Sequence, residues 1–235
     1  MSAADAPPSR TRIDTAGDTL RRQRQGEPVD VRRVLDAYVV LDRFRQQWAE
    51  RPWPLTAVNM GLRSMVRTLR LRGEVSQRLK RANRIVDKLC RLRTMRLSQM
   101  EDVGGCRVVV EGRAEVDRLR ERIRLQWRTD VIAETDYVAR PKRDGYRAVH
   151  ILVRRHGLVV EVQLRTRRQH VWATTVERLE SSRGRRVRET AGDQETVAAL
   201  QGTAALMDQL DRGETAAPET VARVEAWLRS LRSRA

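Results

Sequence analysis

The sequence predicts an α+β fold, in which a mixed β-sheet of about five strands is packed by helices. Two observations indicate this class. The middle of the chain holds short apolar runs with the period of strands, such as CRVVVEG at 106–112. The segments on both sides of it carry apolar residues at roughly helical spacing. This change of period places a sheet in the middle of the chain, with helices before and after it.

The first part of the chain is expected to be helical after a polar start. Residues 1–27 are small, polar and charged, with two adjacent prolines and a Gly-Glu-Pro break, which is typical of a disordered basic arm. Helical spacing of apolar residues then runs from Val29 to Glu50, and further helices are expected over about 60–71 and 78–95.

The middle and the end complete the expected order of elements. After the strand at 106–112 come a helix at 114–127, a strand within 130–139, and a hairpin over 146–166 that turns at His156-Gly157. Helices at 168–181, 192–213 and 217–233 follow. We therefore expect four parts: an arm (1–27), a helical lead-in (28–59), a core domain (60–181) and C-terminal helices (182–235).

Composition limits the classes of function. The 48 Lys+Arg residues against 31 Asp+Glu give a formal net charge of +17, which favours a polyanionic partner or an anionic substrate. Cys90 and Cys106 are too few for a disulfide framework or a zinc site. The N-terminus lacks the apolar core of a secretory signal, and no apolar run reaches the length of a membrane span. A cytoplasmic location is expected.

Two carboxylates stand where strands can present them. Asp102 lies just ahead of the strand at 106–112, beside Gly104 and Gly105, which let the backbone turn tightly or approach a ligand closely. Glu161 alternates with apolar neighbours on the second hairpin strand, so it shares one face with Gln163 and Arg165. That polar face is either the wet side of a half-exposed sheet or the floor of a site, and both remain open at this point.

The surrounding cations suggest phosphate chemistry. Two carboxylates from separate strands can share a magnesium ion, which prefers oxygen ligands and keeps waters and substrate phosphates in its shell. Cations on the phosphates, a bridging metal and a base for an incoming hydroxyl are the elements of phosphoryl transfer. Each cation taken singly is more typical of a solvated helix face. The cations concerned are Arg78, Lys80, Arg81, Arg84, Arg107, Lys142 and Arg165.

Five motifs occur in the order and spacing of a known family: RLKRANRIVDKL (78–89), EDVGGCRVVV (101–110), DYVARPKRDGYRAVH (136–150), EVQLRT (161–166) and WATTVE (172–177). Over residues 60–180 the chain resembles the RelA/SpoT-type alarmone synthetase domain, which has a nucleotidyltransferase-like fold. It is most similar to the stand-alone small synthetases, and the lead-in VNMGLRSMVRT resembles that of the toxin members, which pair with antitoxins.

The resemblance implies a pyrophosphokinase that moves pyrophosphate from ATP to a ribose 3′-hydroxyl and releases AMP. It implies that Asp102 and Glu161 hold magnesium, with Glu161 as second ligand or as base. Arg78, Lys80, Arg81 and Arg107 would bind ATP. The acceptor would contact Lys142, Asp144, Tyr146, which would stack on its base, His150, Gln163, Arg165 and Glu177. Two of these have structural alternatives, because Tyr146 could be a strand-start aromatic and His150 a core histidine.

The loop at 141–150 departs from the family, which usually has asparagine and serine where this chain has Asp144 and Ala148. An acid in place of an amide loses hydrogen-bond donors and adds charge, which puts guanine recognition in doubt. Together with the +17 charge, this favours the 3′ CCA end of tRNA as acceptor and a translation-blocking toxin. The alternatives are an alarmone synthetase that uses GDP, GTP or an adenine nucleotide, and an inactive RNA- or antitoxin-binding module. A protein antitoxin and an oligomer are possible partners.

Overall fold

The computed structural model describes residues 7–50, 53–182, 194–222 and 226. The helices are α1 (Arg10–Arg24), α2 (Val31–Gln46), α3 (Pro54–Thr68), α4 (Ala82–Arg91), α5 (Arg113–Gln126), α6 (Arg167–Ser182) and α7 (Gln194–Asp211), with a short 3-10 turn at Leu97–Gln99. The strands are β1 (Gly73–Leu79), β2 (Gly104–Val110), β3 (Val131–Asp136), β4 (Val149–Arg155) and β5 (Leu158–Thr166). Among these helices, none is long and apolar enough to cross a membrane.

The five strands form one mixed sheet in the order β1-β2-β5-β4-β3, which confirms the expected α+β class. The pairs β1–β2, β5–β4 and β4–β3 are antiparallel, and β2–β5 is parallel. The hairpin between β4 and β5 turns at His156 (φ 49°) and Gly157 (φ 82°), as the sequence predicts.

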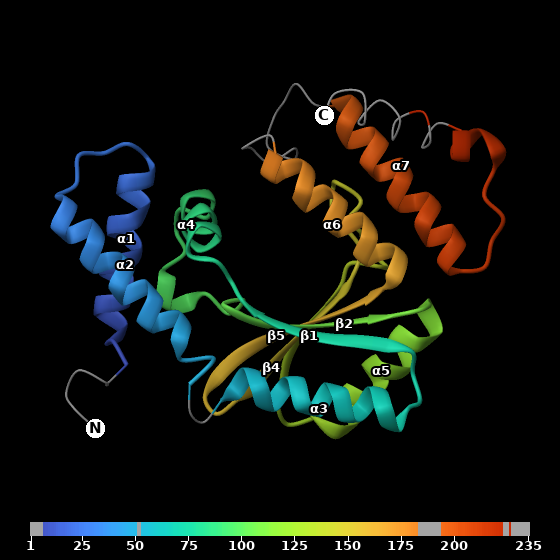
Figure 1. Cartoon of the computed structure of the whole chain (residues 1–235), viewed down its shortest axis with the longest axis horizontal. Coiled ribbons are helices and arrows are strands. Elements are labelled where there is room, and N and C mark those ends of the chain that lie inside the picture. Colours follow the sequence, from blue (N-terminus) through green and yellow to red (C-terminus); the bar gives the residue numbers. More distant parts are fainter. Residues whose placement is uncertain (1–6, 51–52, 183–193, 223–225, 227–235) are drawn as a thin grey trace.

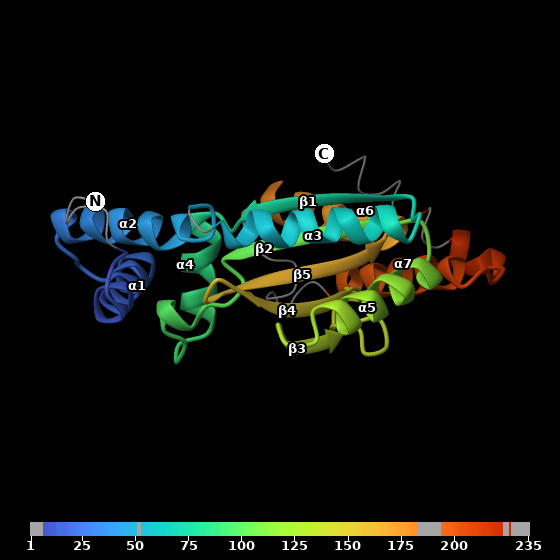
Figure 2. The ribbon, with the colours of Figure 1, turned by 90° about the horizontal axis from the view of Figure 1, so that it is seen from below.

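The sheet has a helix layer on each face (Figure 1 and Figure 2). Helices α3 and α5 cover one face, where the inward side chains of β2, β4 and β5 join the main hydrophobic core. Helices α6 and α7 lie over the other face. Alternation along β5 therefore sends Val160, Val162 and Leu164 into the core and leaves the polar residues of that strand towards α6.

Residues 10–24 correct the expectation of a disordered arm, because they form helix α1. Ser9 caps it by accepting a hydrogen bond from the Arg12 amide at 3.3 Å. Its few apolar residues, including Ile13 and Leu20, are buried in the main core. Arg21 clamps α1 to the segment after α4 by donating to the carbonyl of Met95 at 2.6 Å. The apolar stripe is narrow and the rest of the helix is polar or charged. For this reason the composition of the segment resembles that of a disordered one.

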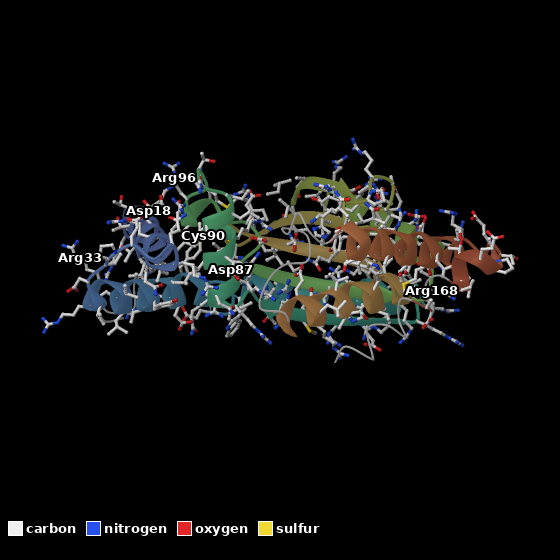
Figure 3. The ribbon with its side chains drawn as sticks, turned by 90° about the horizontal axis from the view of Figure 1, so that it is seen from above. Asp18, Arg33, Asp87, Cys90, Arg96 and Arg168 are labelled. Atoms are coloured by element: carbon white, nitrogen blue, oxygen red, sulfur yellow. The ribbon has the colours of Figure 1, made fainter. Side chains whose placement is uncertain are left out.

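Helices α1 and α4 meet at one end of the molecule (Figure 1). Asp87 and Cys90 of α4 lie at this end (Figure 3), and Arg24 of α1 forms an ion pair with Asp87 at 2.7 Å. Cys90 and Cys106 are both free thiols, as expected. Burial raises the pKa of the Cys106 thiol to about 12, so this group stays protonated and unreactive.

Two other expectations need correction. Residues 73–79 form the edge strand β1, whereas the sequence predicted that a helix begins at Arg78. An edge strand has solvent along one side, and GEVSQRL carries too few apolar residues to show the strand period. The expected boundary at 59/60 falls inside α3, which is continuous from Pro54 to Thr68. The predicted helix at 217–233 lies largely outside the described residues. Of its described residues, 218–222 and 226 are helical.

Candidate active site

Strand pairing brings the polar side chains of four strands onto the sheet face below α6. In the register of β2 with β5, Arg107 lies beside Gln163, and Gly105 beside Glu161. On the other side of β5, His150 of β4 is the partner of Gln163. Gln163 is 8% exposed and Arg165 is 3% exposed, so this face is covered. Of the two possibilities left open by the sequence, this burial excludes the wet side of a half-exposed sheet, so the floor of a site stays the prediction.

Asp102 lies between two lysines at the start of β2. Lys80 Nζ donates to one carboxylate oxygen at 2.5 Å, and Lys88 Nζ donates to the other at 2.8 Å. The three side chains are between 16% and 21% exposed. Burial alone would raise the pKa of Asp102, but the two ammonium groups hold it below its usual value. Asp102 is therefore a carboxylate at neutral pH.

Glu161 belongs to a closed ring of five hydrogen-bonded side chains. His150 Nδ1 lies 2.8 Å from Glu161 Oε1, and Gln163 Nε2 donates to Oε2 at 2.6 Å. Arg165 Nη2 donates to Gln163 Oε1 at 3.0 Å and to the Tyr146 hydroxyl at 2.6 Å. The Tyr146 hydroxyl lies 2.7 Å from His150 Nε2, which closes the ring.

The hydrogen bonds of the ring indicate which of its groups donate and which accept. Because the Tyr146 oxygen accepts from Arg165, its own proton can donate to His150 Nε2, and His150 Nδ1 then donates to Glu161. Burial alone would raise the pKa of Glu161, but the hydrogen bonds from His150 and Gln163 lower it to about 2. Glu161 is thus kept ionised, and it is linked to Tyr146 through a single imidazole.

Asp102 and Glu161 line the same small cavity, with a volume of about 40 Å³. Arg107 and Ser76 border this cavity and also a larger one of about 510 Å³, which is in the size range of ligand pockets. The small cavity is lined by Ser76, Gln77, Arg78, Lys80, Asp102, Val103, Gly105, Cys106, Arg107, Glu161 and Gln163. The larger one is lined by Arg63, Val66, Arg67, Gly73, Glu74, Val75, Ser76, Arg107, Val109 and His170.

The site has a strongly positive field. Burial and the nearby guanidiniums of Arg165 and Arg78 lower the pKa of Arg107. Burial and the charges of Arg107 and Arg165 likewise lower the pKa of His170 on α6. Cations held close together with so few counterions are stabilised by an anion, so the cavity suits a phosphorylated ligand. The carboxylate of Glu177, exposed on α6, acts electrostatically on Arg107 and His170.

The loop before β4 carries the other expected acceptor residues. Lys142 Nζ lies 4.7 Å from the centre of the Tyr146 ring and 4.3 Å from that of Tyr137. Tyr146 is only 7% exposed, and the Trp172 and His150 rings lie close to it. Asp144 is 3% exposed, and its Oδ1 accepts a hydrogen bond from the Tyr146 amide at 3.1 Å. The Asp144 carboxylate thus points into its own turn.

Six of the residues expected from the sequence line the small cavity, and Tyr146, His150 and Arg165 join them through the ring around Glu161. Lys142, Asp144 and Glu177 line neither of the two cavities. Arg81 is exposed at the start of α4 and lines neither cavity. Sequence reasoning missed Lys88 and His170. Lys88 is eight residues after Lys80, but that spacing gave no signal because Lys80 was expected inside the helix rather than before it. Gly104 also has a role that was not foreseen, because the Trp48 ring occupies the place of its missing side chain.

Residues 77–180, which hold nearly every residue of the site, match the family described as "Region found in RelA / SpoT proteins". Residues 77–180 are less than half of the chain, and this part is similar to the RelA/SpoT region.

Two curated relatives are similar to parts of the chain. GTP pyrophosphokinase YjbM of Bacillus subtilis (strain 168) is 29% identical over 87 residues, which is 33% of this chain and 41% of the relative. The uncharacterized protein Rv1366 of Mycobacterium tuberculosis (strain H37Rv) is 33% identical over 115 residues, 48% of this chain and 42% of the relative. The matches thus span about two-fifths of these relatives' lengths.

Solved structures share the fold around the RelA/SpoT region. The small alarmone synthetase 1 from Bacillus subtilis, bound to its product pppGpp, matches with a TM-score of 0.56 and 22% identity, over 72% of this chain and 94% of that chain. The same protein bound to AMPCPP matches with a TM-score of 0.53 and 16% identity, over 72% and 94%. A GTP pyrophosphokinase family protein from Streptococcus pneumoniae matches with a TM-score of 0.55 and 24% identity, over 71% of this chain and 90% of that chain.

Proposed function

We propose that this chain is an ATP pyrophosphokinase that transfers the β- and γ-phosphates of ATP to the ribose 3′-hydroxyl of GDP or GTP. The 3′-oxygen attacks the β-phosphorus, the bond from that phosphorus to the α–β bridging oxygen breaks, and AMP leaves. The observation that carries the proposal is the pair of ionised carboxylates, Asp102 and Glu161, in one cation-lined cavity inside the RelA/SpoT region.

The donor and acceptor sides follow from the positions of the side chains. Arg78, Lys80 and Arg107 border the small cavity from β1 and β2 and would bind the phosphates of ATP, with Lys88 as a further cation. Arg81, at the exposed start of α4, could contribute only at the rim. On the other side of Glu161, the ring through His150 leads to Tyr146, which would stack on the acceptor base.

The remaining acceptor residues surround this ring. Gln163 and Arg165 fix Glu161 and Tyr146 through their hydrogen bonds, and Lys142 would meet a phosphate of the acceptor. Glu177 would act through the field at Arg107. Asp144 supports the loop from within, a task that an asparagine oxygen would perform equally well. The departure from the family loop therefore gives no reason to exclude guanine.

Magnesium fits the two carboxylates as an ion that arrives with ATP. Within the described residues no cluster of three or more His, Cys, Asp and Glu could hold a metal by itself. Asp102 and Glu161 nevertheless border one cavity, and magnesium commonly takes one or two carboxylates and completes its shell with waters and phosphates. They would hold the ion, which supplies charge neutralisation to the phosphates and acidifies a nearby hydroxyl. The low pKa of Glu161 favours its role as a ligand over that of a strong base.

The 3′ end of tRNA is a second candidate acceptor. It is favoured by the net charge of +17, because a polyanionic backbone rewards many cations where a mononucleotide needs few. The similar proteins named above whose names state an activity are alarmone synthetases and GTP pyrophosphokinases, and Asp144 accepts a hydrogen bond from its own turn. We therefore place guanine nucleotides first and the toxin function, with its antitoxin partner, second.

The test uses ATP labelled in the β- and γ-phosphates, magnesium and the purified chain, with GDP, GTP, AMP and deacylated tRNA offered in parallel. We expect label on GDP or GTP and equimolar AMP. Label on tRNA that is lost when the terminal adenosine is removed would establish the second candidate instead. Label on none of the four, from a folded protein that binds ATP, would contradict the proposed activity and favour an inactive binding module.

A further inference from the structure

Helix α7 covers the side of the site where the acceptor is expected. Its residues Leu200 and Ala204 pack with Tyr146 and Trp172 in a second hydrophobic cluster, separate from the main core. Figure 1 shows α7 beside α6, on the same face of the sheet. The Tyr146 ring is 7% exposed in this arrangement. A purine can stack only on an accessible ring face. Lys142 and Arg165 lie over the Tyr146 ring at 4.7 and 5.0 Å from its centre, and Leu200 and Ala204 of α7 pack against the same side chain. The seated α7 therefore closes part of the acceptor position assigned to Tyr146.

The contact between α7 and the acceptor loop is close because residue 145 is a glycine. A Cβ at Gly145 would lie 2.8 Å from the Ala204 Cβ and 3.1 Å from the Gln201 Cα, and its φ of +90° also favours glycine. Gln201 Nε2 donates to the Arg143 carbonyl at 2.5 Å, and Trp172 Nε1 donates to the Leu200 carbonyl at 3.0 Å. The backbone of α7 thus lies directly against the loop.

Two carboxylates anchor the other end of α7. Asp208 is 5% exposed and forms ion pairs with Arg113 at 3.1 Å and with Arg147 at 3.9 Å. It also pairs with Arg212, the residue after the end of α7. Asp211 pairs with Arg168 of α6 at 2.9 Å and accepts from the Thr166 hydroxyl at 2.5 Å. Figure 3 labels Arg168 beside α7. No residue of this anchor belongs to the proposed catalytic set.

We propose that α7 is a movable cover of the acceptor subsite, so that the acceptor nucleotide binds only after α7 moves off residues 143–146. This inference rests on the proposed function, in which Tyr146 stacks on the acceptor base. The seated contact consists of the apolar cluster around Leu200 and Ala204, two hydrogen bonds and the Asp208–Asp211 anchor. The Asp208 and Asp211 side chains are 7% and 0% exposed, so removing either charge from these buried ion pairs should weaken the seat of α7 strongly.

The cover has a specific kinetic consequence. When the competent state is only fractionally populated, the apparent affinity for the ligand is reduced by that fraction. Weakening the anchor should therefore strengthen acceptor binding. The ATP phosphates would lie at Lys80 and Arg78, which α7 does not contact among the interactions described, so ATP affinity should not change.

The first experiment compares the wild type with the double variant Asp208→Asn/Asp211→Asn. We expect the acceptor KM to fall at least threefold while the Kd for ATP is unchanged. Glu121→Gln is the matched control, because Glu121 is exposed on α5 and its ion pair with Arg124 lies outside the anchor. It should leave both constants at the wild-type values. A folded double variant with an unchanged acceptor KM would overturn the cover.

The second experiment, deuterium exchange, remains decisive where the double variant does not fold. In the wild type with AMPCPP, saturating GDP should speed exchange of the α7 amides, and unchanged or slower exchange there would overturn the cover. A folded double variant should exchange faster over 143–150 without any acceptor. These readings need no turnover. An opened α7 with no transfer to any acceptor therefore contradicts the proposed function, whereas transfer with α7 still protected contradicts the cover.

Discussion

Glu161 owes its ionised state to two neighbours rather than to solvent. Its folded pKa of about 2 lies below the usual value, so the carboxylate stabilises the fold at all pH values above its unfolded pKa. That contribution is lost as the pH falls towards 2. The side chain is thus a source of stability and also the centre of the proposed chemistry. Catalytic carboxylates often have raised pKa values, and Glu161, with its lowered pKa, differs from them.

Glu161→Gln should therefore change the pH dependence of stability. The free energy of unfolding of the wild type should exceed that of the variant most at pH 7. The difference should shrink by roughly 1 kcal/mol at pH 3.5, because unfolding then lets the Glu161 carboxylate of the wild type take up a proton. Urea unfolding at the two pH values measures it. A difference that is the same at both would contradict the account of Glu161. Glu121→Gln, at an exposed position on α5, should show no such dependence.

Tyr146→Phe tests the ring of hydrogen bonds apart from stacking. The change keeps the aromatic face and removes the hydroxyl shared by Arg165 and His150, which costs roughly 1–3 kcal/mol when buried partners lose it. We expect kcat to fall about tenfold with little change in the acceptor KM. Tyr146→Ala should raise that KM as well. Steady-state kinetics of both variants decide, and a Tyr146→Phe enzyme with wild-type kcat would show that the ring does not orient Glu161.

At the scale of elements, Gly104 sets how the helical lead-in docks on the sheet. The Trp48 Cδ1 atom lies 2.2 Å from where a Cβ of residue 104 would be, and Trp48 Nε1 donates to the Val159 carbonyl at 2.6 Å. The sequence explained this glycine by a turn or a ligand. The actual reason, a tryptophan from 56 positions earlier, is a tertiary contact that no local pattern reveals.

Gly104→Ala should accordingly destabilise the protein by about 1–3 kcal/mol, because Trp48 is 3% exposed and has little room to shift. Gly202→Ala is the control: nothing lies within 4 Å of the added carbon inside α7, and the helix should gain up to about 1 kcal/mol. Denaturant midpoints of both variants give the comparison. Equal stability of Gly104→Ala and wild type would mean that Trp48 does not hold the lead-in.

How far the sequence predicts an element depends on where its neighbours come from. The buried strand β2, the hairpin at His156-Gly157 and helix α5 carry their own periodicity, so they were predicted. Helix α1 and edge strand β1 are mostly polar, and their few apolar residues become meaningful only against α2, α4 and β2. The roles of Lys88 and α7 were missed for the same reason, because each acts on a residue far along the chain.

At the scale of the whole molecule, the charge of +17 does not by itself identify the acceptor. Many arginines are engaged in holding the fold together. Arg120 binds Glu134 and Asp136, and Arg21 donates to two carbonyls beside α1. A count of cations cannot separate these from the cations that face the cavity, which is why composition favoured RNA more strongly than the geometry does.

The most direct test of the central claim is the release of AMP in a single turnover with ATP, magnesium and GDP. The wild type and Glu121→Gln should produce AMP and 3′-pyrophosphorylated GDP in equal amounts. Asp102→Asn and Glu161→Gln, folded and able to bind ATP, should be at least a thousandfold slower if these carboxylates form the transfer site. Transfer at the wild-type rate by either variant would place the chemistry elsewhere in the molecule.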